Sequence, residues 1–87
     1  MITPSIHPIR FGLETLTEGA PWNELLNIWR FADNLGFDSL WTSDHMTPSI
    51  LPDTTTPVFD GWTALAALAA GTKHARCGVM ITANGYR

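Results

Sequence analysis

The adjacent pair Asp44-His45 is the strongest candidate for chemistry in this 87-residue sequence. An imidazole titrates near neutral pH, so it can give a proton to a substrate oxygen or take one from it. Asp44 could orient the imidazole, fix a backbone amide or accept a hydrogen bond from a bound molecule. Adjacent residues of a strand point to opposite faces, so we expect only one of the two side chains to enter a site. The alternative is structural: a loop histidine that caps a strand, and an aspartate that makes a hydrogen bond at the strand end.

A second set of polar residues, Thr82 and Asn84, follows the apolar segment Gly78-Val79-Met80-Ile81. Their uncharged donors and acceptors suit the polar edge of a heterocyclic ring, which needs no charged partner. Trp41 and Met46 flank the same region and could form a pocket wall, although residues of this type more often belong to a core. The alternative for the segment as a whole is a plain buried strand.

Other reactive side chains show no arrangement that supports chemistry. Cys77 is the single cysteine and cannot form an internal disulfide, so we expect a small buried hydrophobe in a reducing cytoplasm. His7, His45 and His74 are too widely spaced for a metal-binding motif, and we therefore predict no metal. Arg87 could reach a phosphate group or be solvated at the chain end.

The composition excludes several classes of protein. Eight acidic and five basic residues give a net charge of -3, which leaves no basic footprint for a nucleic acid and no cationic patch for a membrane surface. The one notable run of small apolar residues, 64–70, is far shorter than the ~20 residues that cross a bilayer. The first residues lack the basic start and apolar core of a signal peptide, so we expect a cytoplasmic protein.

Alternating helix and strand patterns position these residues. Apolar residues recur at helical spacing through residues 22–35, with polar residues on the opposite face, which indicates an amphipathic helix. Pro21 suits the start of this helix, and Gly36 suits its left-handed C-cap. The expected buried stripe consists of Leu25, Ile28, Trp29, Ala32 and Leu35.

A second helix follows a long loop. Residues 43–59 contain several prolines and form a loop longer than ~12–15 residues, and loops of that length are usually functional. Asp60 suits the N-cap of an Ala-rich helix over residues 61–70, in which we expect Trp62 to pack. The strand patterns fall on residues 10–15, 37–42 and 76–82.

The order strand, helix, strand, helix, strand predicts an α/β fold. Residues 10–42 match the length of about 30 residues of one βαβ unit, and right-handed crossovers place both helices on one face of a parallel sheet. The chain lacks the Gly-x-Gly-x-x-Gly and Gly-Lys-Ser/Thr motifs, which disfavours a dinucleotide-binding or P-loop fold. We therefore favour the N-terminal β-α-β-α-β portion of a (β/α)8 TIM-like barrel over a doubly wound sheet.

A complete barrel of this type has about 250 residues, so we expect an incomplete barrel. Residues 1–9 are predicted to be a flexible N-terminal tail, and residues 10–87 a partial barrel domain. One face and both edges of the predicted sheet lack cover. Open edges favour association, so we expect an oligomer.

Four segments resemble the luciferase-like monooxygenase family, in family order and spacing. They are residues 22–41, Ser43-Asp44-His45, residues 60–69, and Gly78-Val79-Met80-Ile81-Thr82 followed by Asn84-Gly85-Tyr86-Arg87. The resemblance covers residues 10–87 and implies a TIM-like barrel. The family commonly has proline directly before the tryptophan of the second helix, where this chain has Gly61.

The resemblance implies an oxidoreductase or monooxygenase that uses reduced flavin mononucleotide (FMN) or the deazaflavin coenzyme F420, with F420 slightly favoured. It implies hydride or oxygen transfer involving a small organic substrate, with His45 as the catalytic proton carrier. The F420-type branch also has a non-prolyl cis peptide in its third strand, and Met80-Ile81 is the matching bond here. The residues implied in cofactor binding are Asp44, Met80, Ile81, Thr82 and Asn84.

Two functions remain open on the sequence. The chain is either the N-terminal part of such an enzyme, inactive on its own, or a non-catalytic truncated half-barrel that functions only through assembly with itself or another chain. A barrel of unrelated chemistry is a third alternative. It is disfavoured because residues 43–59 contain neither a carboxylate cluster for a metal nor a lysine for a Schiff base.

Overall fold

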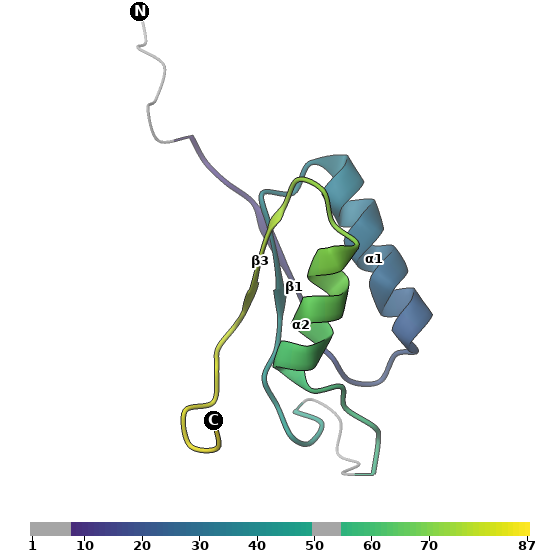
Figure 1. Cartoon of the computed structure of the whole chain (residues 1–87), viewed down its shortest axis with the longest axis vertical. Helices are drawn as coiled ribbons and strands as arrows, with labels where there is room; N and C mark the ends of the chain where they lie inside the picture. Colours follow the sequence, from purple (N-terminus) through teal and green to yellow (C-terminus); the bar gives the residue numbers. More distant parts are fainter. Residues whose placement is uncertain (1–7, 50–54) are drawn as a thin grey trace, which may run out of the picture.

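The computed structural model describes residues 8–49 and 55–87 and shows an α/β fold. Its elements are β1 (Gly12–Thr15), α1 (Trp22–Leu35), β2 (Ser39–Thr42), α2 (Gly61–Ala70) and β3 (Arg76–Val79). The strands form one parallel sheet in the order β1-β2-β3, and both helices pack against the same face of it (Figure 1). The predicted fold class and element order are confirmed. Most of the predicted tail, with His7, and part of the predicted loop lie outside the described residues.

The helix boundaries predicted from the sequence are confirmed for both α1 and α2. α1 begins after Pro21 and ends at Gly36, whose φ of 95° is the left-handed conformation that favours glycine. α2 begins after Asp60, whose carboxylate accepts hydrogen bonds from the backbone N–H and the hydroxyl of Thr63, each at 2.9 Å. Among the described residues, no helix is both long and apolar enough to cross a membrane.

The three strands are shorter than predicted. Before the ladder begins, the Asp38 N–H donates to the Phe11 carbonyl oxygen at 2.9 Å, and the Asp38 carboxylate accepts from the Phe11 N–H at 2.8 Å. At the other end, the Met80 N–H donates to the Thr42 carbonyl oxygen at 2.7 Å. Because β2 ends at Thr42, the residues after Met80 have no neighbouring strand within the described chain. The prediction of a strand through Thr82 is therefore wrong.

The hydrophobic core lies between the sheet and the two helices. Trp29 is fully buried there, and its indole N–H donates to the Thr15 hydroxyl at 2.7 Å, so the polar atom of this core residue is satisfied. Cys77 packs against this core, but it is only half-buried, whereas we expected a buried residue. The buried apolar residues are Leu25, Trp29, Ala32, Leu40, Ala64 and Leu68.

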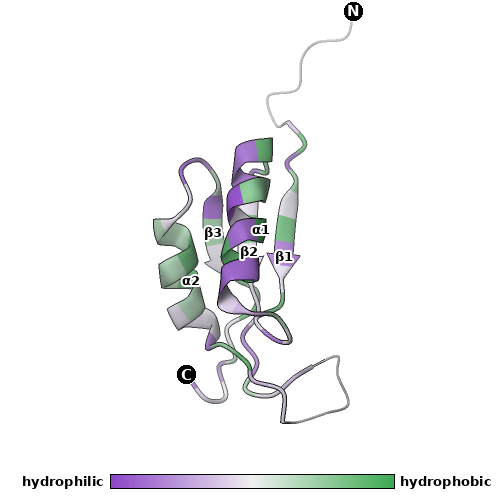
Figure 2. Cartoon of the chain, turned by 90° about the vertical axis from the view of Figure 1, so that its right-hand side faces the viewer, coloured by the Kyte–Doolittle hydropathy of each residue, from purple (hydrophilic) through white to green (hydrophobic). Residues whose placement is uncertain are grey.

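Two residues of the predicted buried stripe are exposed, so that part of the prediction is wrong. Ile28 and Leu35 are 45% and 62% exposed. Together with Phe31 they line an apolar groove of about 550 Å³ beside Leu13 of β1. β1 is an edge strand, so no further element covers this side of α1 within the described chain. Trp62, which we expected to pack, is likewise 47% exposed. Figure 2 shows apolar and polar residues alternating along α1.

A buried carboxylate holds the turn between α2 and β3. Asp33 of α1 is 3% exposed and accepts backbone hydrogen bonds from Lys73, His74 and Ala75 at 2.8–3.0 Å. These bonds, led by the one from Lys73, lower the pKa of Asp33 below its ordinary value. One side chain of α1 thereby ties that helix to the start of β3.

On the face of the sheet opposite the helices, Trp41 lies over two glycines of the neighbouring strands. Its indole N–H donates to the Ser39 hydroxyl at 2.9 Å, which fixes the ring along β2. A Cβ atom on Gly78 of β3 would lie 2.7 Å from ring carbon Cζ3 of Trp41, and one on Gly12 of β1 would lie 3.1 Å from Nε1. The ring therefore occupies space that only glycine leaves open on both sides.

We predict that Gly78→Ala destabilises the fold. The new methyl group would lie 2.7 Å from the Trp41 ring. Overpacking of this kind costs about 1–3 kcal/mol. Urea denaturation followed by circular dichroism measures the change in the free energy of unfolding. Gly85→Ala is the matched control, because a Cβ atom there has nothing within 4 Å. Equal stability of the two variants would contradict the position of Trp41.

Candidate functional site

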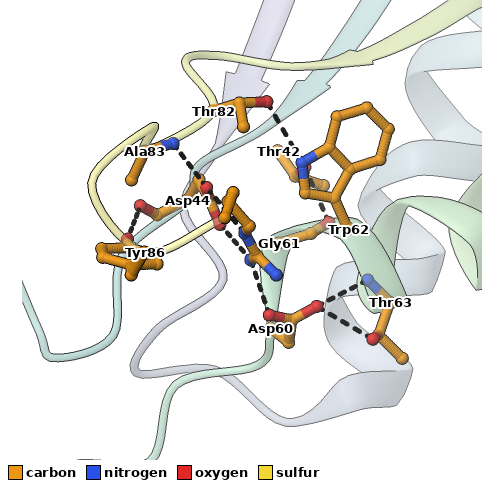
Figure 3. A network of polar contacts seen from close by, with 10 residues as sticks. Thr42, Asp44, Asp60, Gly61, Trp62, Thr63, Thr82, Ala83 and Tyr86 are labelled. Carbon is orange, nitrogen blue, oxygen red and sulfur yellow. Dashed lines mark hydrogen bonds and ion pairs between the residues drawn. The ribbon is translucent and has the colours of Figure 1, made fainter.

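The C-terminal ends of β2 and β3 meet the N-terminus of α2 at one edge of the sheet (Figure 3). Residues 43–45 leave β2 at this edge, and residues 80–87 leave β3. In parallel α/β folds, ligands bind at the C-terminal ends of the strands, because loops from neighbouring strands converge there. The predicted site residues belong to these two segments.

A buried carboxylate, Asp44, joins these three elements. Asp44 is 4% exposed and accepts a hydrogen bond from the Ala83 N–H at 2.7 Å. It also forms an ion pair with Arg87, whose guanidinium lies 2.6 Å from Asp60. Because Asp60 is the N-cap of α2, Arg87 connects the end of β2 to the start of α2 through two carboxylates, and Figure 3 labels both of them, Asp44 and Asp60. We call this arrangement the Asp44–Arg87–Asp60 bridge.

All three members of the bridge are charged at neutral pH. The hydrogen bond from Arg87 holds the pKa of Asp44 below its ordinary value of 3.8, with a further contribution from the Ala83 N–H, although burial opposes the shift. Hydrogen bonds from the Thr63 N–H and from Arg87 lower the pKa of Asp60 to about 2. The two carboxylates in turn raise the pKa of Arg87.

Neutral hydrogen bonds reinforce the same junction. The Tyr86 hydroxyl donates to the carbonyl oxygen of Asp44. The indole N–H of Trp62 donates to the Thr82 hydroxyl at 3.1 Å (Figure 3). The segment after β3 is thus attached to β2 through Asp44 and to α2 through Trp62.

The first turn of α2 packs directly on the end of β2. The Thr42 hydroxyl donates to the Gly61 carbonyl oxygen at 3.1 Å. A Cβ atom on Gly61 would lie 2.3 Å from the Ser43 carbonyl oxygen. This contact leaves no room for a side chain at residue 61.

The structure separates the two members of the Asp44-His45 pair. Asp44 is buried and forms part of the Asp44–Arg87–Asp60 bridge, whereas the His45 side chain is exposed. The two side chains therefore meet different surroundings, as expected, although both residues follow β2 rather than lie within it. His45 is the member that a bound molecule can reach.

The predicted cofactor-binding residues after β3 lie at the same edge. Met80 and Ile81 are 40% and 79% exposed. The peptide bond between them is cis, as the family resemblance implies. Thr82 is half-buried, and Asn84 is exposed. The structure brings the backbone of this segment to Asp44, and the roles of its side chains in binding remain predictions.

Sequence reasoning missed how the site is held together. Arg87 lies between Asp44 and Asp60 and pairs with both carboxylates, an arrangement that the sequence did not predict. Asp60 is predicted only as a helix cap, and Trp62 only as a packing residue. The partners in these contacts are 20 to 43 residues apart in the chain. No helix or strand period connects positions at such distances, so the sequence carries no local signal for them.

The remaining reactive residues form no further constellation in the part of the chain that the structure describes. No three histidine, cysteine, aspartate or glutamate side chains of that part gather as a metal ion would require. The Cys77 sulfur lies 3.5 Å from the Thr72 hydroxyl oxygen and donates to the Ala75 carbonyl oxygen at 3.7 Å. The absence of a metal remains a prediction.

The sequence of this chain is similar to those of known proteins. Residues 3–87 match the family model of the luciferase-like monooxygenases, and the chain belongs to this family. One relative is the F420-dependent glucose-6-phosphate dehydrogenase of Microbacterium testaceum (strain StLB037). It is 34% identical over 80 residues, which make up 92% of this chain and 23% of the relative.

A solved structure shares the fold. It is an F420-dependent secondary alcohol dehydrogenase in complex with an F420-acetone adduct, and it matches 84% of this chain with a TM-score of 0.73 and 26% identity. The match covers 22% of that chain, so the present chain spans less than a quarter of the length of either relative. The β-α-β-α-β unit is therefore part of a TIM-type barrel, as predicted.

We predict that Arg87→Met destabilises the chain and reduces its sensitivity to acid. Methionine retains much of the side-chain length and removes the charge, which leaves Asp44 buried without its counter-ion. In the native chain, Asp44 and Asp60 have lower pKa values than in the unfolded state. Their contribution to stability is therefore complete above about pH 5 and is lost as the pH falls toward about 2.

Thermal melts over this pH range test the prediction. The variant should melt clearly below the native chain at neutral pH, and the difference should shrink with acid as the carboxylates of the native bridge become protonated. Arg76→Met is the matched control, because it removes an equal charge from an exposed position on β3. A difference that stays constant at every pH would contradict the assignment of the bridge.

Proposed function

We propose that this chain is the N-terminal part of a cytoplasmic F420-dependent oxidoreductase, which transfers a hydride between the deazaflavin and a small organic substrate. The observation that carries the proposal is the exposed His45 next to the buried Asp44 of the Asp44–Arg87–Asp60 bridge, at the C-terminal edge of a parallel sheet. Both relatives named above depend on F420, and both are dehydrogenases. This favours F420 over FMN, and hydride transfer over oxygen transfer.

The residues at this edge fit a deazaflavin in their chemistry. Such a ring system is flat and largely apolar, with carbonyl oxygens and ring nitrogens along its rim, and when bound it supplies the hydride chemistry. Met80 and Ile81 offer exposed apolar surface for the ring. Thr82 accepts the Trp62 hydrogen bond but keeps its own hydroxyl proton to donate, and Asn84 offers a carbonyl and an amide. We therefore assign the contact with F420 to these four residues after β3.

His45 is the residue that we assign to proton transfer. Oxidation of an alcohol to a carbonyl compound releases a proton together with the hydride, and a neutral imidazole can accept that proton as a general base. The exposed position of His45 allows it to pass the proton on to water. Asp44 has a positioning role, because its carboxylate holds the Ala83 backbone and Arg87 rather than a substrate.

A second candidate function follows from the uncovered surfaces. The apolar groove that Ile28, Phe31 and Leu35 line has no cover within the described chain. A non-catalytic truncated half-barrel would bury such surface by assembly with itself or with another chain. That function requires no proton acceptor at residue 45.

We predict that His45→Asn removes most of the turnover. Asparagine keeps a polar side chain at the exposed position but cannot accept a proton, so kcat should fall by roughly 10²–10⁴-fold. The loss of oxidised F420 absorbance, with glucose 6-phosphate or 2-propanol as the hydride donor, measures the rate. The protein is expressed from its complete reading frame. His74→Asn is the matched control, because His74 is an exposed histidine in the turn before β3.

Unchanged turnover of His45→Asn would contradict the role assigned to His45. A complete protein that binds no F420, and that elutes as one defined oligomer in size-exclusion chromatography, would favour the assembly function instead.

A further inference from the structure

Two consecutive buried residues after β1 hold the loop that carries His45. Thr17 and Glu18 are 1% and 8% exposed. The Thr17 N–H donates to the Ser43 hydroxyl oxygen at 3.3 Å, and the Glu18 carboxylate accepts from the Ser49 N–H at 2.9 Å. Ser43 precedes His45 and Ser49 follows it, so the loop is fixed on both sides of the histidine.

The contact between Glu18 and Ser49 consists of charge-assisted hydrogen bonds. The Ser49 N–H donates to Oε1 at 2.9 Å and to Oε2 at 3.0 Å, and the Ser49 hydroxyl donates to Oε1 at 3.1 Å. Hydrogen bonds to a carboxylate are stronger than those between neutral groups. Both carboxylate oxygens accept hydrogen bonds from Ser49, and these bonds help to compensate for the burial of the charge.

The returning end of the loop is held by the same two residues. The Phe59 N–H donates to the Thr17 carbonyl oxygen at 2.8 Å, and Glu18 forms an antiparallel bridge with Val58. The holding residues are buried, whereas His45 is exposed. The backbone on both sides of His45 is therefore held in place, while its imidazole is exposed to solvent.

We propose that Glu18 is a positioning residue for His45 and acts through Ser49. Its carboxylate fixes the position of the loop backbone after β2, and thereby the position of the His45 imidazole at the C-terminal ends of the strands. The inference rests on the proposed function of His45. It adds a residue from the segment after β1 to a site otherwise built from β2, β3 and α2.

Variants of the protein from its complete reading frame test this role. Glu18→Ala removes the acceptor, and Glu18→Gln keeps one side-chain oxygen that can accept the Ser49 N–H. Glu24→Gln is the matched control at an exposed glutamate of α1. Amide hydrogen exchange of peptides from residues 43–49 reports the anchor without any cofactor. Steady-state kinetics with F420 and either glucose 6-phosphate or 2-propanol report its consequence.

We expect Glu18→Ala to accelerate exchange in residues 45–49 and to lower kcat by about 10- to 100-fold, because a misplaced proton acceptor slows the chemical step. The KM for F420 should change little, since F420 is assigned to the segment after β3. Glu18→Gln should recover part of both effects, and Glu24→Gln should match the native protein. If Glu18 only stabilised the fold, Glu18→Ala would lower the melting temperature, and it would not lower kcat while leaving the KM for F420 unchanged.

Exchange and kcat of Glu18→Ala equal to the native values would overturn the proposal, while the loss of turnover in His45→Asn would leave the proposed function intact. If His45→Asn keeps full turnover, the proposed function fails, and the exchange data alone decide whether Glu18 anchors the loop. If Glu18→Ala does not fold, Ser49→Ala replaces it, because this change removes only the hydroxyl bond. Native exchange in both Ser49→Ala and Glu18→Gln would then overturn the proposal.

Discussion

One buried negative charge, that of Asp44, organises the C-terminal edge of this sheet. A parallel sheet brings the ends of its strands together, but the segments that follow them need contacts of their own. Asp44 holds the Ala83 backbone and pairs with Arg87, and Arg87 extends the connection to Asp60 at the start of α2. A buried carboxylate is stable only while its hydrogen bonds and counter-ion are present. The placement of residues 80–84 next to β2 therefore depends on this charge.

The buried carboxylates of the described chain are supports, and the exposed His45 is the group to which we assign proton transfer. Asp33 holds the turn before β3, Glu18 holds the loop after β2, and Asp44 holds the segment after β3. Each accepts backbone N–H groups, and such bonds fix the path of the chain rather than the conformation of one side chain. Of these three carboxylates, Glu18 and Asp44 lie at the same end of the sheet as His45, whose side chain is exposed. A proton carrier has to reach its substrate, whereas the residues around it have to stay in place.

Features that depend on neighbours in sequence were predictable, and features that depend on distant partners were not. The period of α1, and Asp60 as the cap of α2, are local, so both helix boundaries are correct. The strands are shorter than predicted because a strand ends where its partner ends, as β2 does at Thr42. Helical spacing predicted that Ile28 is buried, but no other element of the described chain covers it, and it is exposed. Glu18 and Arg87 make their contacts 31 and 43 residues away, beyond any pattern in a single sequence.

The ionisation of Asp44 in the folded protein tests this view of the site most directly. Carbon NMR of its side-chain carboxyl, followed from neutral to acidic pH, measures the pKa of that one group. We predict a titration midpoint clearly below the ordinary value of 3.8, with loss of the native Ala83 amide resonance in the same step. A midpoint at or above 3.8 would contradict it, because the carboxylate would then lack the arginine and the backbone N–H that hold the edge together.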